Sequence, residues 1–500
     1  MSEQPNKPDS GVSPLSNAQP DKPISPGIFR EYDIRGVVGE DLTLDVVEKV
    51  GKAFGTWLRE GGAKTVSVGR DVRLSSNEIR DAVSRGFTST GLNVIDVGVC
   101  PTPLLYFSLF HLQVDGGVMI TGSHNPPEYN GLKLCKGKET LHGKEIQEVR
   151  KRIIQKYYRE EPKTGTIESH PIIPDYIKMM KEKFSFPKPL NFVIDCGNGA
   201  ASVLAMDLFK SLGLNPVGLF CEPDGTFPNH HPDPTVLKNL KDLMGAVKQH
   251  GAEFGIGYDG DADRIGVVDE RGEVIWGDML TLLFARDIIA NPPADMKTPK
   301  PIFISEVKAS QRFYDDLEKR GARPIMWKTG HSPMKAKMKE TKALLGGEMS
   351  GHIFFADRYF GYDDALYASC RLLEILSREK AKNPNTKLSD LLSDLPQTET
   401  TPEIRVDCPD AIKFKLVDEL SRAVGDMTEI KVPGKEPIRI IDKITVDGIR
   451  LRFENGWALV RASNTQPALV LRYEASTKEE LENYRKGVEG LLEEVKERVK

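Results

Sequence analysis

Cysteine is scarce in this sequence, and its spacing excludes two common uses of the residue. The 500 residues contain only six cysteines. No two of them form a Cys-x-x-Cys pair, and no group of them has the spacing of a zinc site. We therefore expect free thiols in a reducing compartment. The six positions are Cys100, Cys135, Cys196, Cys221, Cys370 and Cys408.

Long apolar runs are absent as well. No stretch of about 18 consecutive apolar residues occurs, so we expect no transmembrane helix and no membrane partner. Residues 1–26 are rich in Pro, Ser, Asn and Asp and lack the apolar segment of a secretory signal peptide. We expect a disordered tail over residues 1–26 and a cytoplasmic protein.

Neither sign of charge is in large excess. The formal net charge is -4, which gives no reason to expect nucleic acid as a partner. Basic residues that bind phosphate must therefore be clustered locally. A chain of 500 residues predicts three or four domains. We expect a monomer or a weak oligomer.

One pattern occurs three times along the chain. Each copy contains an apolar strand, an amphipathic helix that ends near a glycine, and a second strand, which together indicate a βαβ-based unit. Glycine suits the left-handed position that closes a helix. The first strands are KTVSVGRD from Lys64, NFVIDCGN from Asn191 and PIFISEVK from Pro301. The helices begin near Ser75, Ala201 and Ser310 and end near Gly91, Gly213 and Gly321.

In each copy a third apolar run ends in a polar, glycine-rich loop. The three loops are TGSHNP at 121–126, DGDADR at 259–264 and GEMSGH at 347–352. Ligands of open α/β sheets bind outside the carboxyl ends of the strands. We therefore expect the three loops to meet in one cleft.

The C-terminal part follows a different pattern. A linker near 385–400 leads to alternating apolar and polar residues around Asn455-Gly456, which predict a hairpin, and to a helix from about Lys478. The predicted fold class is therefore α/β, with three repeated units of mixed sheet and flanking helices plus a C-terminal α+β domain around a central cleft. The predicted limits are 1–26 for the tail, 27–171, 172–274 and 275–392 for the α/β domains, and 393–500 for the α+β domain.

The first loop carries a serine suited to hold phosphate. Gly122 lets the backbone approach a ligand at Ser123 closely. A serine hydroxyl needs a base or a charged partner to become a good nucleophile. His124 and Lys133 are near enough in the sequence to supply either.

The second loop predicts a magnesium site. It places Asp259, Asp261 and Asp263 at alternate positions, where three carboxylates repel one another unless a cation compensates them. A calcium-binding EF-hand is the alternative. Arg264 stands where that motif needs glycine, and the flanking segments indicate strands rather than helices. Arg264 instead suits a phosphate partner beside the ion.

The third loop and the last domain offer groups for a sugar and for a phosphate. Polar groups on the third loop can recognise sugar hydroxyls by direction, and a histidine before it can transfer protons near neutral pH. An arginine with small donors between two strands indicates a phosphate nest. The residues are Glu348, Ser350 and His352 on the loop, Lys328 and His331 before it, and Arg461, Ser463, Asn464, Thr465 and, farther on, Arg472 in the last domain.

Together these strings resemble the α-D-phosphohexomutase superfamily. TGSHNPPEYNG and DGDADR are highly specific to it, IFREYDIRG at 28–36 strengthens the match, and the resemblance covers roughly residues 28–495. The resemblance implies four domains around a cleft, a phosphoserine at Ser123, one Mg²⁺ held by this serine and by Asp259, Asp261 and Asp263, and hexose 1,6-bisphosphate as intermediate and activator. It also implies that Glu348 and Ser350 bind the sugar and that Arg461, Ser463, Asn464 and Thr465 bind the non-reacting phosphate. Further implied active-site groups are Tyr32, Arg35, Lys133, Arg264, Lys308, His331 and His352.

The sugar loop narrows the expected substrate. GEMSGH is similar to the loop of bacterial and archaeal phosphomannomutase/phosphoglucomutase enzymes, so Met349 favours mannose and glucose phosphates. Gln466 departs from the second threonine that is common after Thr465. The expected reaction moves a phosphoryl group between C1 and C6 through phosphorylated Ser123, with His331 as the first candidate for proton transfer and with Arg35 and Lys133 assisting.

Three alternatives stay open at this point. A phosphoglucosamine mutase of the same superfamily would share the fold and the phosphoserine. A serine phosphatase-type hydrolase would need a His/Asp set for two zinc ions, which no spacing shows. A sugar-phosphate binding relative without turnover is the third.

Overall fold

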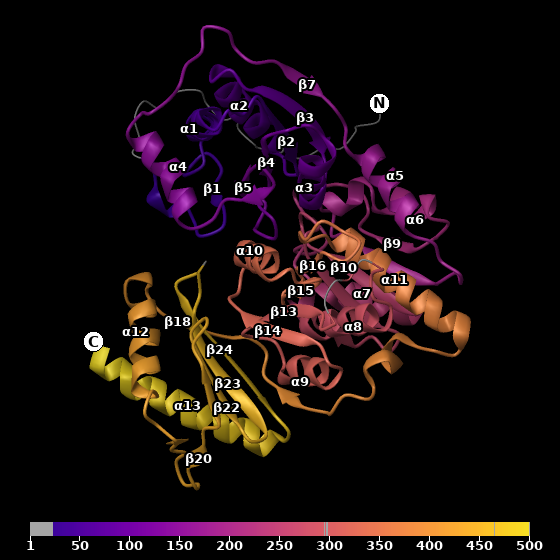
Figure 1. The fold of residues 1–500 in the computed structure, drawn as a ribbon, viewed down its shortest axis with the longest axis vertical. Coiled ribbons are helices and arrows are strands. Elements are labelled where there is room, and N and C mark those ends of the chain that lie inside the picture. Colours follow the sequence, from indigo (N-terminus) through magenta and orange to yellow (C-terminus); the bar gives the residue numbers. More distant parts are fainter. Residues whose placement is uncertain (1–23, 295, 297–298, 465, 500) are drawn as a thin grey trace, which may run out of the picture.

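The computed structural model describes residues 24–294, 296, 299–464 and 466–499. Four main sheets, each with its own helices, follow one another along this part of the chain (Figure 1). The first three are mixed sheets flanked by helices, and the fourth is antiparallel with two long helices packed on it. The predicted fold class is confirmed.

The three α/β units share one strand order. In each, the second, first and third strands run parallel in that spatial order, and a fourth strand pairs antiparallel with the third. Parallel neighbours need crossover connections, which the helices supply. Each polar loop joins the third strand to the fourth. The predicted helix-closing glycines have left-handed backbones, with φ of 80° at Gly91, 76° at Gly213 and 80° at Gly321.

Domain 1 is built on a seven-stranded sheet in the order β1-β5-β4-β2-β3-β7, with β6 paired to β5. Helices α1 and α2 pack against each other beside this sheet. The elements are η1 Pro26–Ile28, β1 Ile34–Val37, α1 Leu44–Glu60, β2 Thr65–Arg70, α2 Ser76–Ser89, β3 Asn93–Val99, α3 Thr102–His111, β4 Gly116–Ile120, β5 Tyr129–Lys136, β6 Glu139–Thr140, α4 Lys144–Ile154 and β7 Ile167–Ser169.

Domain 2 contains a five-stranded sheet in the order β12-β11-β10-β8-β9. The helix predicted from Ala201 begins as a short 3₁₀ turn and becomes α-helical only at Ala205. The elements are α5 Ile173–Lys183, β8 Phe192–Asp195, η2 Ala200–Val203, α6 Ala205–Ser211, β9 Val217–Leu219, η3 Leu237–Leu240, α7 Lys241–Gln249, β10 Phe254–Tyr258, β11 Ile265–Asp269 and β12 Val274–Ile275.

Domain 3 has a four-stranded sheet in the order β14-β13-β15-β16. Helix α9 begins after Ser310, whose Oγ accepts a hydrogen bond from the backbone N of Arg312 at 3.3 Å, as an N-cap residue does. The elements are α8 Gly277–Ala290, β13 Ile302–Glu306, α9 Gln311–Lys319, β14 Arg323–Trp327, α10 His331–Thr341, β15 Leu345–Gly347, β16 Ile353–Phe355, α11 Ala365–Lys382 and η4 Leu388–Leu392.

Domain 4 is an antiparallel sheet in the order β17-β24-β23-β22-β21, with β18 also paired to β24. The predicted hairpin is present, but its turn is Glu454-Asn455, and Gly456 already pairs with Phe453. The elements are β17 Glu399–Thr400, β18 Ile404–Asp407, α12 Asp410–Ala423, β19 Glu429–Ile430, β20 Ile438–Arg439, β21 Asp442–Ile444, β22 Ile449–Phe453, β23 Gly456–Ala462, β24 Ala468–Ala475 and α13 Lys478–Val499.

The apolar core differs between the first three domains and the fourth. One continuous buried cluster joins domains 1, 2 and 3 and includes Phe107 of α3, Tyr176 of α5 and Tyr367 of α11. Domain 4 has its own core, and its apolar contact with domain 3 is a small cluster around Val307, Trp457 and Leu459. Since burial of apolar area stabilises an interface, the fourth domain gains less from apolar contact with the third than the first three domains gain from one another.

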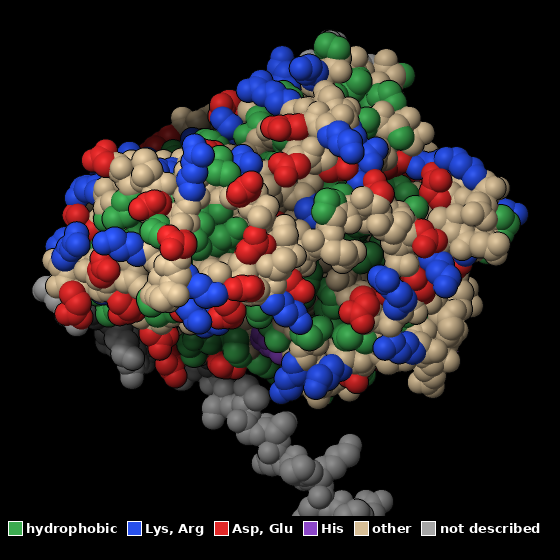
Figure 2. All heavy atoms as spheres, turned by 90° about the horizontal axis from the view of Figure 1, so that it is seen from below, with side chains coloured by type: hydrophobic (Ala, Val, Ile, Leu, Met, Phe, Trp, Pro, Cys, Tyr) green, Lys and Arg blue, Asp and Glu red, His purple; other side chains and the backbone are tan. Residues whose placement is uncertain are grey.

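Charged side chains cover the surface in a mixed pattern. On the face shown in Figure 2, Lys and Arg side chains are interspersed with Asp and Glu side chains. Within the described ranges, none of the helices combines the length and the apolar character needed to cross a bilayer.

Candidate active site

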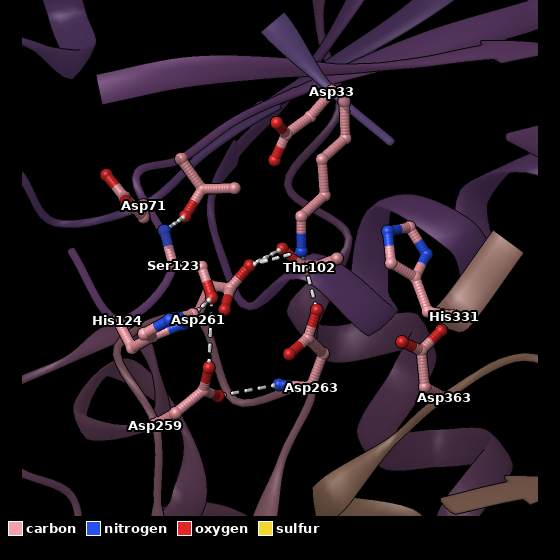
Figure 3. Close-up of polar contacts among 12 residues, drawn as sticks. Asp33, Asp71, Thr102, Ser123, His124, Asp259, Asp261, Asp263, His331 and Asp363 are labelled. Carbon is pink, nitrogen blue, oxygen red and sulfur yellow. Dashed lines mark hydrogen bonds and ion pairs between the residues drawn. The ribbon is translucent and has the colours of Figure 1, made fainter. Parts of the chain in front are cut away.

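Ser123 lies on the loop between β4 and β5 with its side chain turned toward domain 2. Its backbone N donates to Oγ1 of Thr121 at 2.8 Å, and its φ of 48° is in the left-handed region. Its Oγ donates to Oδ2 of Asp259 at 3.1 Å and lies 3.1 Å from Nδ1 of His124 (Figure 3). The first and second predicted loops are therefore in direct contact.

Arg73, a residue that no local motif had indicated, holds the Ser123 loop in shape. Its side chain is 2% exposed and donates hydrogen bonds to four carbonyl oxygens of the loop segment. It also forms a buried ion pair with Asp71, at 3.2 Å between Nε and Oδ2. The four acceptors are Ser123 at 2.8 Å, Asn125 at 2.6 Å, Pro126 at 2.6 Å and Tyr129 at 2.9 Å.

Gly122 is required because the Arg73 guanidinium occupies the space of a side chain. A Cβ on Gly122 would lie 2.5 Å from Cζ of Arg73, closer than carbon atoms approach. The glycine directly before Ser123 is thus required by an arginine about fifty residues earlier in the chain. The signal in the sequence was the pair Asp71 and Arg73 directly after a buried strand.

An Arg73→Lys variant is expected to lower the turnover number, kcat, by about tenfold or more while the protein stays folded. Lysine keeps the charge beside Asp71, but its ammonium has three donors and no planar fork, so it cannot reach all four carbonyls. Steady-state kinetics with circular dichroism checks this. Arg85→Lys, at an exposed arginine of the same domain, is the matched control. Equal kcat for Arg73→Lys and wild type would contradict the assigned role.

The acid loop between β10 and β11 forms a compact, buried cluster. Asp259, Asp261 and Asp263 are fully buried, and their ligand atoms lie within 4.8 Å of one another. Nζ of Lys133 donates to Oδ2 of Asp261 at 2.8 Å and to Oδ2 of Asp263 at 2.5 Å. Oγ1 of Thr102 donates to the same Asp261 oxygen at 2.5 Å. Lys133, which the sequence analysis placed near Ser123, is thus bound to the aspartates.

The residues of this cluster fit a divalent cation. Oδ1 of Asp261 and Oδ1 of Asp263 are buried and have no hydrogen-bond partner among the described residues. Burial and the neighbouring Asp261 and Asp263 raise the pKa of Asp259 well above its ordinary value, whereas the Lys133 ammonium outweighs burial and lowers the pKa of Asp261 and of Asp263. Carboxylate oxygens without partners are what a hard ion such as Mg²⁺ binds.

Arg264 and His352 connect the acid loop to the third predicted loop, in domain 3. Nε of Arg264 donates to Nε2 of His352 at 3.0 Å. Nδ1 of His352 lies 2.9 Å from Oδ2 of Asp363 and 3.5 Å from Oδ1 of Asp263. Burial alone would lower the pKa of His352, but the two carboxylates outweigh it and raise the pKa. Asp363 is a second residue that sequence reasoning missed, because it follows the motif by eleven positions.

His331 begins helix α10 and is a neutral base in this environment. Burial and the charges of Lys335 and Lys133 hold its pKa well below the ordinary value. Its ring lies edge-on to Tyr32 with centroids 5.6 Å apart, and Figure 3 shows it beside the acid cluster. Arg35 lies on the Ser123 side, where its Nη1 donates to Oδ1 of Asn125 at 2.6 Å.

The third predicted loop, residues 347–352, is organised around two glutamates. Oε1 of Glu348 accepts from the backbone N of Gly330 at 2.6 Å, and Oγ of Ser350 donates to Oε2 of Glu348 at 3.3 Å. Glu306, at the end of β13, accepts from the backbone N of Met349 at 2.9 Å. Burial and the charge of Glu306 raise the pKa of Glu348. Glu306 was missed because a single glutamate at a strand end carries no motif.

Domain 4 reaches the other loops through polar contacts. Nδ2 of Asn464 donates to the hydroxyl of Tyr32 at 2.9 Å, and this hydroxyl donates to the carbonyl of Thr329 at 2.9 Å. Tyr32 thereby joins domains 1, 3 and 4. Nζ of Lys308 donates to Oε2 of Glu403 at 3.1 Å, which joins domain 3 to domain 4.

Only some of the residues predicted to form the phosphate nest lie together on one loop. Nε of Arg461 donates to Oδ2 of Asp447 at 3.0 Å, and Ser463 and Asn464 follow it at the end of β23. Thr465 lies outside the described residues. Arg472 is turned away from the loop, because its Nη1 donates to the carbonyl of Lys308 and contacts Sδ of Met349.

An open cavity lies between domain 1 and domain 4. Its volume is about 1120 Å³, and it is lined from domain 1 by Arg30 and Glu31 and from domain 4 by Phe414 and Asn464. Asn464, a residue of the predicted phosphate nest, thus lies at the rim of this cavity. The described residues of all four predicted loops are thus linked to one another around the junction of the domains.

Comparison with known proteins supports the four-domain organisation. Residues 26–162, 174–272 and 276–398 match the phosphoglucomutase/phosphomannomutase α/β/α domains I, II and III, and residues 403–491 match the C-terminal domain of the same family.

Relatives from bacteria match nearly the whole chain. The phosphomannomutase/phosphoglucomutase of Pseudomonas aeruginosa is 44% identical over 91% of this chain and 93% of its own. The phosphoglucomutase of Neisseria meningitidis serogroup A is 42% identical over 94% of this chain and 97% of its own.

A solved structure shows the same fold. The crystal structure of a phosphoglucomutase/phosphomannomutase family protein from Burkholderia thailandensis superposes with a TM-score of 0.85 at 39% identity, over 95% of this chain and 99% of that one. The chain therefore belongs to the phosphoglucomutase/phosphomannomutase family and is an isomerase.

Proposed function

We propose that this chain interconverts the 1-phosphates and 6-phosphates of mannose and glucose through a phosphoserine at Ser123. One observation carries the proposal. The Ser123 hydroxyl is buried against Asp259 of the acid loop, at the place where the loops of the other domains are linked. Two carboxylate oxygens without hydrogen-bond partners, a buried arginine and a neutral histidine lie around it, and phosphoryl transfer depends on groups of these kinds.

The phosphoryl group would move between two oxygen atoms. The bond from phosphorus to Oγ of Ser123 breaks while a bond to a sugar hydroxyl oxygen forms, and the hydroxyl proton passes to a base. A second transfer, from the other end of the hexose 1,6-bisphosphate, restores the phosphoserine. Asp259, Asp261, Asp263 and an oxygen of the phosphoserine would hold one Mg²⁺, which neutralises charge on the phosphate when bound.

His331 is our candidate for the base. A base must be unprotonated when the sugar hydroxyl reacts, and the lowered pKa keeps His331 neutral near pH 7. Arg264 would stabilise the equatorial oxygens of the transferring phosphoryl group, and its Nε, 4.0 Å from Oδ2 of Asp259 beside Ser123, supports this role. Arg35 and Lys133 assist by holding the serine loop and the aspartates.

The sugar and the non-reacting phosphate would be held from domains 3 and 4. Glu348 and Ser350 would bind sugar hydroxyls, Lys308 and His352 would lie beside them, and Arg461, Ser463, Asn464 and Thr465 would bind the phosphate. The small apolar contact of domain 4 supports movement of this domain while the intermediate turns over. Tyr32 would close the site through its bond to Asn464.

The substrate class is tested by comparing mannose 1-phosphate, glucose 1-phosphate and glucosamine 1-phosphate, each with Mg²⁺ and a trace of glucose 1,6-bisphosphate. We expect the first two to turn over with kcat/KM at least about tenfold higher than the third. Preference for glucosamine 1-phosphate would overturn the sugar assignment and keep the phosphoserine mechanism. Steady release of inorganic phosphate would favour the hydrolase instead.

The predicted domain limits and the predicted cytoplasmic location are also part of this proposal. Strand β7 still pairs with β3, and helix α5 begins two residues after 171, which supports a boundary there. Strand β17 pairs with β24, which supports a last domain from 393. Six cysteines without disulfide bonds support a cytoplasmic location. We expect a monomer or a weak oligomer.

A further inference from the structure

Two cysteines of domain 2 lie side by side although they are 25 positions apart. Cys196 follows β8, Cys221 follows β9, and their Sγ atoms are 3.5 Å apart. Cys196 is fully buried, whereas Cys221 is partly exposed. The two strands are parallel neighbours, so the sheet itself brings these sulfur atoms together.

The backbones that carry the two thiols are already bonded to each other. The backbone N of Cys196 donates to the carbonyl of Leu219 at 3.1 Å, and that of Asn198 donates to the carbonyl of Phe220 at 2.9 Å. A disulfide bond has an S–S length of about 2.0 Å, so the sulfur atoms must approach by about 1.5 Å. Rotation of the two side chains with a small backbone shift can supply that.

Residues 196–200, which begin with Cys196, also pack closely against the acid loop. The backbone N of Ala200 donates to the carbonyl of Gly260 at 2.8 Å. A Cβ on Gly199 would lie 2.9 Å from the same oxygen, which is too close for a real side chain. Gly260 stands between Asp259 and Asp261, so displacement of residues 196–200 moves the backbone that carries these carboxylates.

We propose that Cys196 and Cys221 are a thiol–disulfide modification site, oxidised by hydrogen peroxide, whose closure weakens cation binding at the acid loop. The partly exposed Cys221 reacts first. Its thiolate sulfur attacks one peroxide oxygen, the O–O bond breaks, and hydroxide leaves, which yields a sulfenic acid. The sulfur of Cys196 then attacks the sulfur of Cys221, expelling hydroxide, which takes up the Cys196 thiol proton. Two thiols and one peroxide thus give one disulfide and two waters.

The electrostatic surroundings favour this order. The hydrogen bond with Cys196 lowers the pKa of the Cys221 thiol. The same bond and complete burial raise the pKa of the Cys196 thiol. The attacking thiolate therefore forms on the residue that peroxide can reach. The formation of the bond does not depend on the proposed mutase activity.

The test uses the full chain, treated with a small molar excess of hydrogen peroxide and then alkylated. Before alkylation we expect a mass loss of two hydrogens and an Mg²⁺ concentration for half-maximal thermal stabilisation that rises at least about threefold, and after alkylation and digestion a Cys196–Cys221 cross-linked peptide. Dithiothreitol should reverse all three. Cys221→Ser should show none of them, and Cys408→Ser, at a buried cysteine of domain 4, should behave as wild type.

Other results would overturn the proposal. Sulfinic acid at Cys221 without a cross-link, a bond between two chains, or a cross-link that leaves the Mg²⁺ midpoint unchanged would each do so. A cross-link with a raised midpoint in a chain that lacks mutase turnover would support this inference and reject the proposed function, so the two are distinguishable.

Discussion

A Ser123→Ala variant is expected to lose mutase turnover by at least about a thousandfold, because removal of a covalent nucleophile leaves only binding and electrostatic effects. The hydroxyl oxygen makes two side-chain contacts, to Asp259 and His124, and alanine removes both without adding volume. The loop itself is held by Arg73 through backbone carbonyls, so it should keep its shape. The measurement is the mutase rate with a saturating hexose 1,6-bisphosphate, together with intact mass to detect the phosphate on the wild-type chain.

A second serine provides the matched control. Ser84 is also fully buried, lies in helix α2 away from the loop, and makes no side-chain hydrogen bond among the described residues. Ser84→Ala should retain near-normal turnover. A Ser123→Ala protein that still cycles hexose phosphates would mean that the phosphoryl group is carried elsewhere.

An Asp261→Asn variant is expected to raise the Mg²⁺ concentration for half-maximal activity at least about tenfold and to lower kcat by about a hundredfold. The amide oxygen can keep the bonds from Thr102 and Lys133 that Oδ2 now accepts. The amide nitrogen then takes the place of Oδ1, the buried oxygen without a partner. The variant thus removes one negative charge and one cation ligand with little change in shape.

Thermal unfolding gives a readout that does not require turnover. Binding to the folded state raises the melting temperature, by the equivalent of about 2.7 kcal/mol at a concentration one hundred times Kd. Wild type should show this rise with Mg²⁺, and Asp261→Asn should show much less of it at the same concentration. Asp315→Asn, an exposed aspartate on α9, is the control. If Asp261→Asn responded to Mg²⁺ as wild type does, the cation would have to bind elsewhere.

Much of the fold was predictable because local patterns repeat. Apolar β-branched runs, amphipathic helices and closing glycines recur at Gly91, Gly213 and Gly321, and each decides its own conformation from near neighbours. The loops with Ser123 and with Asp259, Asp261 and Asp263 were predictable for a related reason. Their chemistry lies in a few consecutive residues.

Contacts between distant segments were not predictable from any local pattern. Arg73 is about fifty residues from the carbonyls that it binds, Glu306 is 43 from Met349, and Tyr32 is 432 from Asn464. Single charged or aromatic residues of this kind have no spacing to reveal them. Their roles appear only when the sheets have placed their ends together.

By itself, the sequence determined the three repeated units and indicated the serine proposed to carry phosphate and the acidic loop proposed to hold a cation, because each depends on residues close together in the chain. Only the tertiary structure decided how these parts act on one another. It joined Ser123 to Asp259, turned Arg472 toward Met349 and away from the phosphate loop, and set Cys196 beside Cys221. The physical reason is that burial and charge depend on neighbours in space, and the packing of whole domains chooses those neighbours.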